Sequence, residues 1–386
     1  MFCHLRKCLL ALIIAVLIMT CASLTATGLA AEVGRYNVPA LPYRAVIADF
    51  DSNGWPDIAV VSKYSDVTVF FNPPKVDQRR TLTLKAYFQP ISLAVGDMNG
   101  DGIADIIPAT ETLIGPIYFS DGKGNFQKTD LKLYTPPYAS FIEAGDLNND
   151  RFDDLVVTGI GGEGPYVYLN KQNGSFDKVI ARLRGQKSGI KMSSLDEEED
   201  VRFISHQAVL LDINSDGRKE IFIPDELRGS LWLITEKENS SIPLEIFHEK
   251  DVIAKSVAAF SEKNIKTILL GIQKAGRTEL VFFEGNSWPF PITKRILAKE
   301  IINHIEIYDM DNDGHREIIC LILRNGQSFV AIYKDDSFDV PVYEFPVSAP
   351  ISFTIADIDR DGFNDLIIPD YRDNTLSIVY SPLKKR

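Results

Sequence analysis

From residue 33 onward, short apolar runs alternate with clusters of polar and turn-forming residues. The runs are rich in β-branched and aromatic side chains, as in 58–61, 67–71 and 81–88. About four of them follow one another in each stretch of roughly 48 residues, and no segment keeps the i, i+3, i+4 spacing of an amphipathic helix. This pattern predicts an all-β protein built from short strands joined by turns.

A nine-residue acidic pattern recurs between these runs. It reads Asp-x-(Asp/Asn)-x-(Asp/Asn)-Gly-x-x-(Asp/Glu) and begins at residues 49, 97, 146, 212, 309 and 357. Most intervals are close to 48 residues, and the interval of 97 corresponds to two periods. We therefore expect a degenerate copy near 259–261, where Ala259, Ser261 and Lys263 replace the acids. The longer interval of 66 residues places an insertion at about 183–201.

Seven repeats of four short strands predict a seven-bladed β-propeller over residues 31–386. Such strands cannot bury their faces alone, so neighbouring blades must pack around an axis. The last repeat lacks a fourth strand, whereas residues 33–39 form an extra strand ahead of the first acidic loop. We expect this N-terminal strand to complete the last blade, because ring closure removes an exposed edge. The insertion then lies between the third and fourth blades.

Alternating oxygen side chains followed by a glycine and a further acid are suited to a hard cation. Ca²⁺ takes about 6–8 oxygen ligands, and the glycine allows a sharp turn. Position 12 is never acidic here, which excludes an EF-hand, so position 9 is expected to supply the last ligand. The predicted ligands of up to six Ca²⁺ ions are Asp49, Asp51, Asn53, Asp57, Asp97, Asn99, Asp101, Asp105, Asp146, Asn148, Asp150, Asp154, Asp212, Asn214, Asp216, Glu220, Asp309, Asp311, Asp313, Glu317, Asp357, Asp359, Asp361 and Asp365.

The six loops differ in their suitability for calcium. Those at 309–317 and 357–365 carry four acids each and are expected to bind most tightly. The third loop has Arg151 at the glycine position, where a positive φ is unfavourable, and is the least suited. The alternative is that these segments are solvated turns, since Asp, Asn and Gly favour turns. Clustered carboxylates repel one another, however, which favours the calcium interpretation.

Charge and cysteine content narrow the class of protein. The chain has 386 residues and a formal net charge of −12, so nucleic-acid binding is not expected. Three of its four cysteines lie within the first 21 residues, leaving Cys320 alone in an apolar strand as an expected core thiol. Neither a disulfide framework nor a cysteine-based zinc site is available.

The first thirty residues have the layout of a secretory signal peptide. Arg6 and Lys7 precede an apolar run over 8–19, and small residues follow over 22–31. We expect cleavage near residue 30 and a soluble product, either extracellular or periplasmic, with a net charge of −14. An uncleaved N-terminal anchor is the alternative, although the apolar run is shorter than the roughly 20 residues of a membrane span.

The repeats resemble the FG-GAP/VCBS family, which includes the calcium-loop repeats of integrin α-subunit propellers. The six acidic loops carry the resemblance, together with the segments at 118–126 and 374–383 that follow two of them. The resemblance covers essentially all of 33–386 and implies a seven-bladed propeller. It also implies calcium in the loop between the first two strands of a blade, and frequent roles in adhesion or ligand binding. The degenerate fifth repeat and Arg151 depart from the family pattern.

A ligand is expected on the face opposite the acidic loops, because strand direction alternates within each blade. The loops there offer aromatic and charged side chains that suit a protein or a glycan: Tyr64, Tyr138, Glu163, Asp225, Arg228, Tyr371 and Arg372. Each of these can equally be an ordinary surface residue. No nucleophile motif, phosphate loop or zinc-binding histidine pattern is present in the sequence. We expect a monomeric, non-enzymatic binding or adhesion module; a carbohydrate-active lyase or hydrolase, or a lectin, is the alternative.

Overall fold

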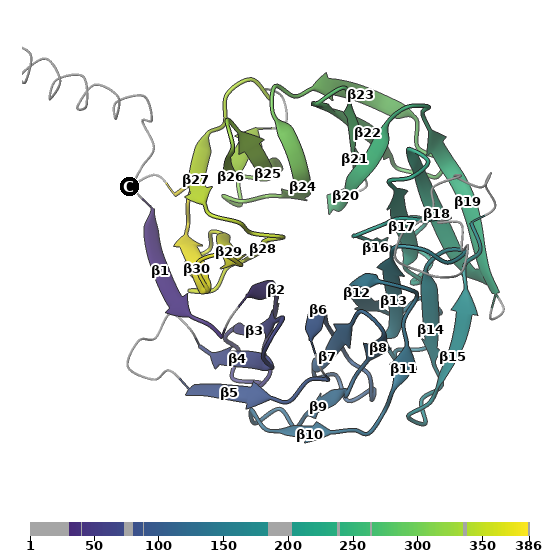
Figure 1. Ribbon diagram of the computed structural model, residues 1–386, viewed down its shortest axis with the longest axis vertical. Helices are drawn as coiled ribbons and strands as arrows, with labels where there is room; N and C mark the ends of the chain where they lie inside the picture. The colour runs from purple at the N-terminus through teal and green to yellow at the C-terminus, as the bar shows by residue number, and fades with distance from the viewer. Residues whose placement is uncertain are drawn as a thin grey trace, which may run out of the picture. The chain divides into compact units, whose positions relative to one another are not determined.

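Seven antiparallel sheets surround a central axis in the computed structural model (Figure 1). It describes residues 31–384 except 40, 73–79, 88, 184–202, 238–239, 263–264 and 335–337. Residues Ala31–Lys384 form one compact unit, and its described residues contain strands and turns but no helix. The predicted seven-bladed β-propeller is thereby confirmed. None of the described residues lies in a helix long and apolar enough to cross a membrane.

Each blade begins with the strand nearest the axis, and the following strands lie progressively farther out (Figure 1). The strands of the first three blades are β2 (Pro42–Ala48), β3 (Asp57–Ser62), β4 (Val67–Phe71) and β5 (Arg80–Leu84); β6 (Pro90–Gly96), β7 (Asp105–Thr110), β8 (Leu113–Ile114), β9 (Tyr118–Ser120), β10 (Phe126–Lys128) and β11 (Leu133–Tyr134); and β12 (Ala139–Gly145), β13 (Asp154–Gly159), β14 (Tyr166–Asn170) and β15 (Phe176–Ile180).

The second blade is interrupted, since β7 pairs with β9 at Ile106 but with β8 at Ala109, and β8 pairs in turn with β11. The strands of the last four blades are β16 (Val209–Leu211), β17 (Glu220–Asp225), β18 (Ser230–Lys237) and β19 (Ser240–His248); β20 (Ile253–Glu262), β21 (Ile265–Lys274), β22 (Arg277–Gly285) and β23 (Ile292–Leu297); β24 (Ile301–Tyr308), β25 (Glu317–Arg324), β26 (Gln327–Lys334) and β27 (Tyr343–Val347); and β28 (Thr354–Ala356), β29 (Asp365–Asp370), β30 (Thr375–Tyr380) and β1 (Glu32–Asn37).

The core lies between neighbouring blades. Every residue of the second strand is buried in the first four blades and in the last, which explains why the residues that follow the initial acid are apolar in succession rather than alternating. Val61 of blade 1, for example, belongs to the same buried cluster as Leu93 and Ile106 of blade 2. Cys320 is fully buried in β25, and burial raises the pKa of its thiol. The expected core thiol is confirmed.

The N-terminal strand closes the ring, as predicted. It pairs antiparallel with β30 along all six of its residues, from Glu32 opposite Tyr380 to Asn37 opposite Thr375. Tyr36 and Val38 are buried against both the first and the last blade. The observed strand begins one residue before the predicted segment and ends two residues before its end.

The degenerate repeat is the fifth blade. Here β20 and β21 are ten residues long and pair directly up to Glu262 opposite Ile265. Ala259 and Ser261 therefore lie within a strand rather than in a loop. Lys263 lies outside the described residues, as do the predicted signal peptide and all but Leu183 of the 183–201 insertion.

Candidate functional site

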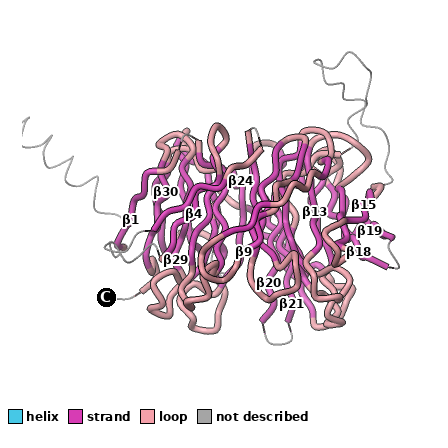
Figure 2. The backbone as a smooth tube through the Cα atoms, turned by 90° about the horizontal axis from the view of Figure 1, so that it is seen from below, coloured by secondary structure: helices cyan, strands magenta, loops and turns pink. Residues whose placement is uncertain are grey.

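The six acidic loops lie on one face of the ring. Each joins the first strand of its blade to the second, as between β2 and β3, so all six lie where the axial strands end. The strands run between two layers of loops (Figure 2). Because each acidic loop joins the first strand of its blade to the second, all six belong to one of these layers. The blades thus bring together the first and last acids of each nine-residue pattern.

Backbone geometry explains the order of residues in the loop. The first Asp accepts hydrogen bonds from the backbone amides of positions 5 and 6; for Asp357, these come from Asp361 at 3.1 Å and Gly362 at 3.0 Å. Position 6 has a positive φ in all six loops, including Arg151 at 72°, which adopts the glycine conformation. Position 4 also has a positive φ throughout, at Ser52, Gly100, Asn149, Ser215, Asn312 and Arg360, a requirement that the motif itself did not reveal.

The acid at position 9 has a structural role that the sequence analysis did not anticipate. Asp57 is fully buried, and its two carboxylate oxygens accept hydrogen bonds from the backbone amides of Phe50 at 3.0 Å and Asn72 at 2.9 Å. It thereby ties the loop to the end of the third strand. Equivalent bonds are made by Asp105, Asp154 and Asp365. Burial raises the pKa of all four carboxyls to about 7.

Three loops bring carboxylates close enough to share a cation. Their side-chain oxygens lie within 4.8 Å of one another in the groups Asp49, Asp51 and Asp57; Asp309, Asp311 and Glu317; and Asp357, Asp359 and Asp361. The Oδ1 atoms of Asp51 and Asp311 are buried and have no hydrogen-bond partner among the described residues. Buried, unpaired anionic oxygens are costly, and a hard cation would satisfy them. The donor sets of these loops therefore fit Ca²⁺.

Asparagine at position 3 distinguishes the loops at 97, 146 and 212. In two of them its amide donates to the acid at position 5: Asn99 to Asp101 at 2.9 Å and Asn214 to Asp216 at 3.1 Å. These loops are partly closed by internal hydrogen bonds, which a cation would have to displace.

Lysines contact both of the four-acid loops. The ammonium group of Lys334 lies 3.1 Å from Glu317, 3.6 Å from Asp313 and 3.7 Å from Asp311. Lys384 lies 2.7 Å from Asp361. Each lysine contributes a positive charge that offsets the fourth acid. Lys334 reaches its loop because β25 and β26 pair Glu317 with Lys334, a contact between residues 17 positions apart.

The substitution Lys334→Met is expected to strengthen calcium binding at the 309–317 loop about tenfold, because a unit charge a few ångströms away contributes about 1–4 kcal/mol near a surface. Without calcium, the same variant should unfold at a lower temperature than the parent protein, since three carboxylates lose their counter-charge. Thermal unfolding with calcium and with chelator measures both effects. Lys299→Met is the matched control, because Lys299 pairs with the exposed Asp339, which lies outside the acidic loops. An identical calcium response in both variants would contradict the assignment of Lys334 as a competing cation.

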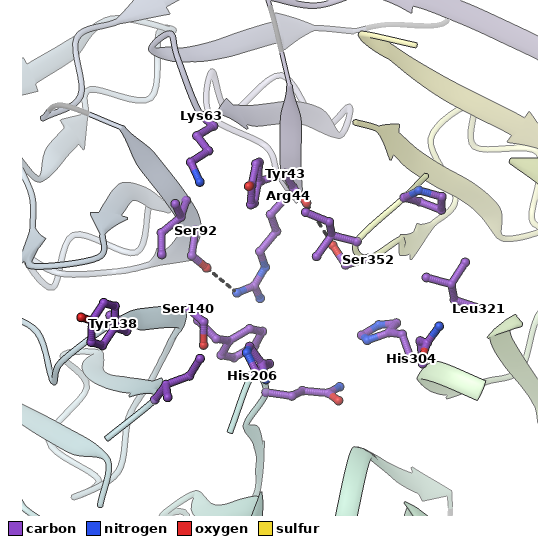
Figure 3. Close-up of a pocket in the computed structure, with 18 of the residues that line it drawn as sticks. Tyr43, Arg44, Lys63, Ser92, Tyr138, Ser140, His206, His304, Leu321 and Ser352 are labelled. Carbon is purple, nitrogen blue, oxygen red and sulfur yellow. Dashed lines mark hydrogen bonds between the residues drawn. The ribbon is translucent and has the colours of Figure 1, made fainter. Parts of the chain in front are cut away.

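A cavity of about 580 Å³ lies at the other end of the axial strands (Figure 3). In five blades the first strand contains a β-bulge, and the extra residue is Tyr43, Ile91, Ser140, Lys255 or Asn303. A bulge redirects the side chain of its extra residue. All five of these residues line the cavity.

The same position lines the cavity in every blade. Tyr43, Ile91, Ser140 and Asn303 each precede the first acid of their loop by six residues, and so do His206 in the fourth blade and Ile351 in the seventh. Both of these also line the cavity. We call this set the mouth ring: Tyr43, Ile91, Ser140, His206, Lys255, Asn303 and Ile351. It was missed in the sequence because its residue types differ, although the six-residue spacing was available.

The mouth ring has two chemically different arcs. Blades 7, 1 and 2 contribute Ile351, Tyr43 and Ile91, whereas blades 3–6 contribute polar or charged side chains. Glu226 positions two members of the polar arc, contacting Nδ1 of His206 at 2.6 Å and Nζ of Lys255 at 3.0 Å. Although burial alone would raise the pKa of Glu226, its bond to His206 and the charge of Lys255 lower it.

Arg44 lies just inside the mouth ring and links three blades. It donates to the carbonyl of Ile142 at 2.6 Å, to Glu143 at 2.7 Å and to Ser92 at 3.3 Å (Figure 3). Its guanidinium group is thus held by protein partners, and it forms part of the cavity wall.

The predicted ligand-face residues do not form one cluster. Of the seven, Tyr138 lines the cavity. Tyr371 makes an edge contact with Tyr43 at 5.6 Å, and Tyr64 is 62% exposed in a neighbouring turn. Asp225 is fully buried and bonded to Arg228 at 2.5 Å, so it is not at the surface of this face. The side chains of Asp225 and Arg228 together close the turn that follows β17.

The remaining two predicted residues lie in turns of the third and seventh blades. Glu163 pairs with Arg182 at 2.5 Å, and the backbone amide of Arg372 donates to Asp370 at 3.2 Å.

Comparisons with known proteins agree with this architecture. The model of the FG-GAP-like repeat family matches residues 49–107 and 276–368. Among solved structures, BBS1N in complex with ARL6DN, soaked with lead, is 11% identical with a TM-score of 0.58, covering 94% of this chain and 99% of that chain. The Dos1 propeller is 10% identical with a TM-score of 0.55, covering 89% and 84%.

A putative 6-phosphogluconolactonase from Bacteroides uniformis is 14% identical with a TM-score of 0.53, covering 86% of this chain and 91% of that chain. At such low identity these structures show the fold alone. The chain is a seven-bladed β-propeller with acidic loops on one face. The matched residues are FG-GAP-like, and together with the propeller fold they confirm the resemblance to the FG-GAP repeat family.

Proposed function

We propose that this chain is an exported, calcium-stabilised binding module that holds a protein or glycan ligand on the face opposite its acidic loops. A propeller with FG-GAP repeats is a general binding scaffold, and one similar structure is a propeller in a protein complex. Calcium would be held mainly by the three loops whose carboxylates converge, around residues 49–57, 309–317 and 357–365. Its contribution would be to neutralise their charge and so rigidify the loops.

The mouth ring is the observation that carries the proposal for ligand binding. Seven side chains from one structural position converge on a single cavity, while the acidic loops lie at the far end of the same strands. Residues that vary in chemistry at a fixed backbone position, on a rigid scaffold, are well placed to determine specificity. We infer a non-enzymatic role, because the sequence carries neither a nucleophile motif nor a zinc-binding histidine pattern.

A binding screen that separates the two faces tests the proposal. Residues 31–386 would be applied to glycan and protein arrays in the presence of calcium, with a parallel assay for newly released reducing ends. We expect a ligand whose binding is reduced by Tyr64→Ala or Tyr43→Ala on the opposite face. Lys123→Glu, in an exposed turn on the acidic face, is the control and should bind normally. Binding lost only in the control variant, or release of reducing ends, would refute the proposed function.

A further inference from the structure

We propose that the mouth ring binds a carboxylate-bearing sugar, with the acid group against its polar arc and the sugar ring against its apolar arc. This inference rests on the proposed function, since it specifies the ligand of the same face. It is carried by the division of the ring, in which Ser140, His206, Lys255 and Asn303 oppose Ile351, Tyr43 and Ile91. A ligand that fills the cavity must therefore be polar on one side and apolar on the other.

The charges around the cavity favour an anion. Arg44, Lys63 and Lys255 line it, whereas Glu226 and Glu143, which pair with two of these cations, do not. The acids therefore lie behind the cations and orient them. Glu111 is the acid in the lining, and it lies 4.0 Å from Lys63. A carboxylate entering the cavity would meet the cations first.

The polar arc offers hydrogen-bonding groups to a ligand in addition to positive charge. The ammonium group of Lys255 has three donors, and Glu226 is its acidic partner. His206 uses Nδ1 for Glu226, so Nε2 is the ring nitrogen left for a ligand. On either side of this pair, Asn303 can donate and accept hydrogen bonds, whereas Ser140, whose hydroxyl donates to the carbonyl of Ser205 at 3.1 Å, can accept them. A charged group flanked by neutral hydrogen-bonding groups matches a sugar acid, whose carboxylate is surrounded by hydroxyls.

The apolar arc provides a flat surface for a sugar ring. Tyr43 is held by an edge contact with Tyr371 at 5.6 Å and by the ammonium group of Lys63, 5.5 Å from its ring centre. Ile91 and Ile351 flank it, and Ile351 is 48% exposed. A volume of about 580 Å³ suits one or two sugar units, whereas a flat protein surface would leave it unfilled. The hollow shape therefore favours the end of an acidic glycan over a protein epitope.

Binding of short oligosaccharides tests this assignment. Trigalacturonate, trimannuronate and neutral galactotriose would be titrated into residues 31–386 by calorimetry at constant calcium. We expect at least one acidic trisaccharide to bind at least tenfold more tightly than galactotriose, and its affinity to fall with salt because the pairing is ionic. Lys255→Met should weaken that binding at least tenfold, the effect of losing about 1.4 kcal/mol.

Two further variants keep the result interpretable. Lys255→Met can perturb folding by leaving Glu226 with one partner fewer, so Lys63→Met, which leaves the Glu226 contacts intact, should also weaken binding. Lys299→Met, at a residue that does not line the cavity, should bind like the parent protein. The inference is overturned if no acidic trisaccharide binds, if galactotriose binds equally well, or if both lining-lysine variants retain full affinity.

The outcome also separates this inference from the proposed function. A protein or neutral glycan found on the arrays and lost in Tyr64→Ala would retain the proposed function while refuting the acidic-sugar ligand. A peptide that binds the mouth ring and is not displaced by any sugar acid would likewise retain the proposed function and refute the acidic-sugar ligand. If no opposite-face substitution affects any ligand, both proposals fail.

Discussion

Chelation of calcium is expected to lower the melting temperature of residues 31–386 by about 5–10 °C. Extracellular calcium sites have dissociation constants near 10⁻⁴–10⁻³ M, so at about 2 mM calcium each site adds roughly 1–2 kcal/mol by mass action. Three converging loops would together add about 3–5 kcal/mol, and the remaining loops a smaller amount. The entropy of unfolding of a chain this long, about 0.7 kcal/mol per kelvin, converts that stabilisation into the expected shift.

Thermal unfolding in calcium and in excess chelator provides the measurement. Asp51→Asn should reduce the calcium-dependent shift, because it removes the negative charge from a half-buried side chain whose buried Oδ1 has no described partner. Asp130→Asn makes the same chemical change at an exposed residue outside the acidic loops and should leave the shift intact. Coincident unfolding curves with and without calcium would contradict the metal assignment for all six loops.

The fold could be predicted because the same pattern of an acidic loop and short strands recurs in nearly every blade. Six acidic loops at nearly constant spacing fixed the number of blades, and the double interval located the fifth blade although its acids are missing. Ring closure also followed, since a last repeat without a fourth strand and an extra strand at 33–39 complement each other. Strand ends still differed by up to a few residues, because backbone pairing can begin or stop at residues other than those that bound the apolar run.

The candidate site could be predicted only where residue type signals chemistry. Acids at alternate positions signal a cation, but Lys334 enters its loop through strand pairing, which no local pattern reports. The charged residues around Asp225 are typical of an exposed turn. The Asp225 side chain is nevertheless buried, because the Arg228 guanidinium group folds back and donates a hydrogen bond to it. The mouth ring shares a backbone position and not a residue type, so only its spacing from the acidic loops connects its members. Residues that build the scaffold recur in each blade, whereas residues that would determine ligand specificity differ from blade to blade and leave no repeated pattern in the sequence.

Loss of the closing strand should destabilise the ring more than any substitution considered above. A chain that begins at residue 40 lacks β1 and with it six paired residues and the buried side chains of Tyr36 and Val38. Burial of those two side chains contributes about 3–5 kcal/mol, and each lost backbone hydrogen bond about 1 kcal/mol. The strand β30 would also become an exposed edge able to pair with other molecules.

We therefore expect the chain from residue 40 to melt at least about 7 °C below the chain from residue 31, or to associate into oligomers. Thermal unfolding and light scattering of the two chains measure these effects. A synthetic peptide of residues 31–39 should restore the melting temperature, because it can occupy the edge of β30 in the register observed here, whereas a scrambled peptide should not. A monomeric truncated chain with an unchanged melting temperature would mean that β1 does not hold the ring closed.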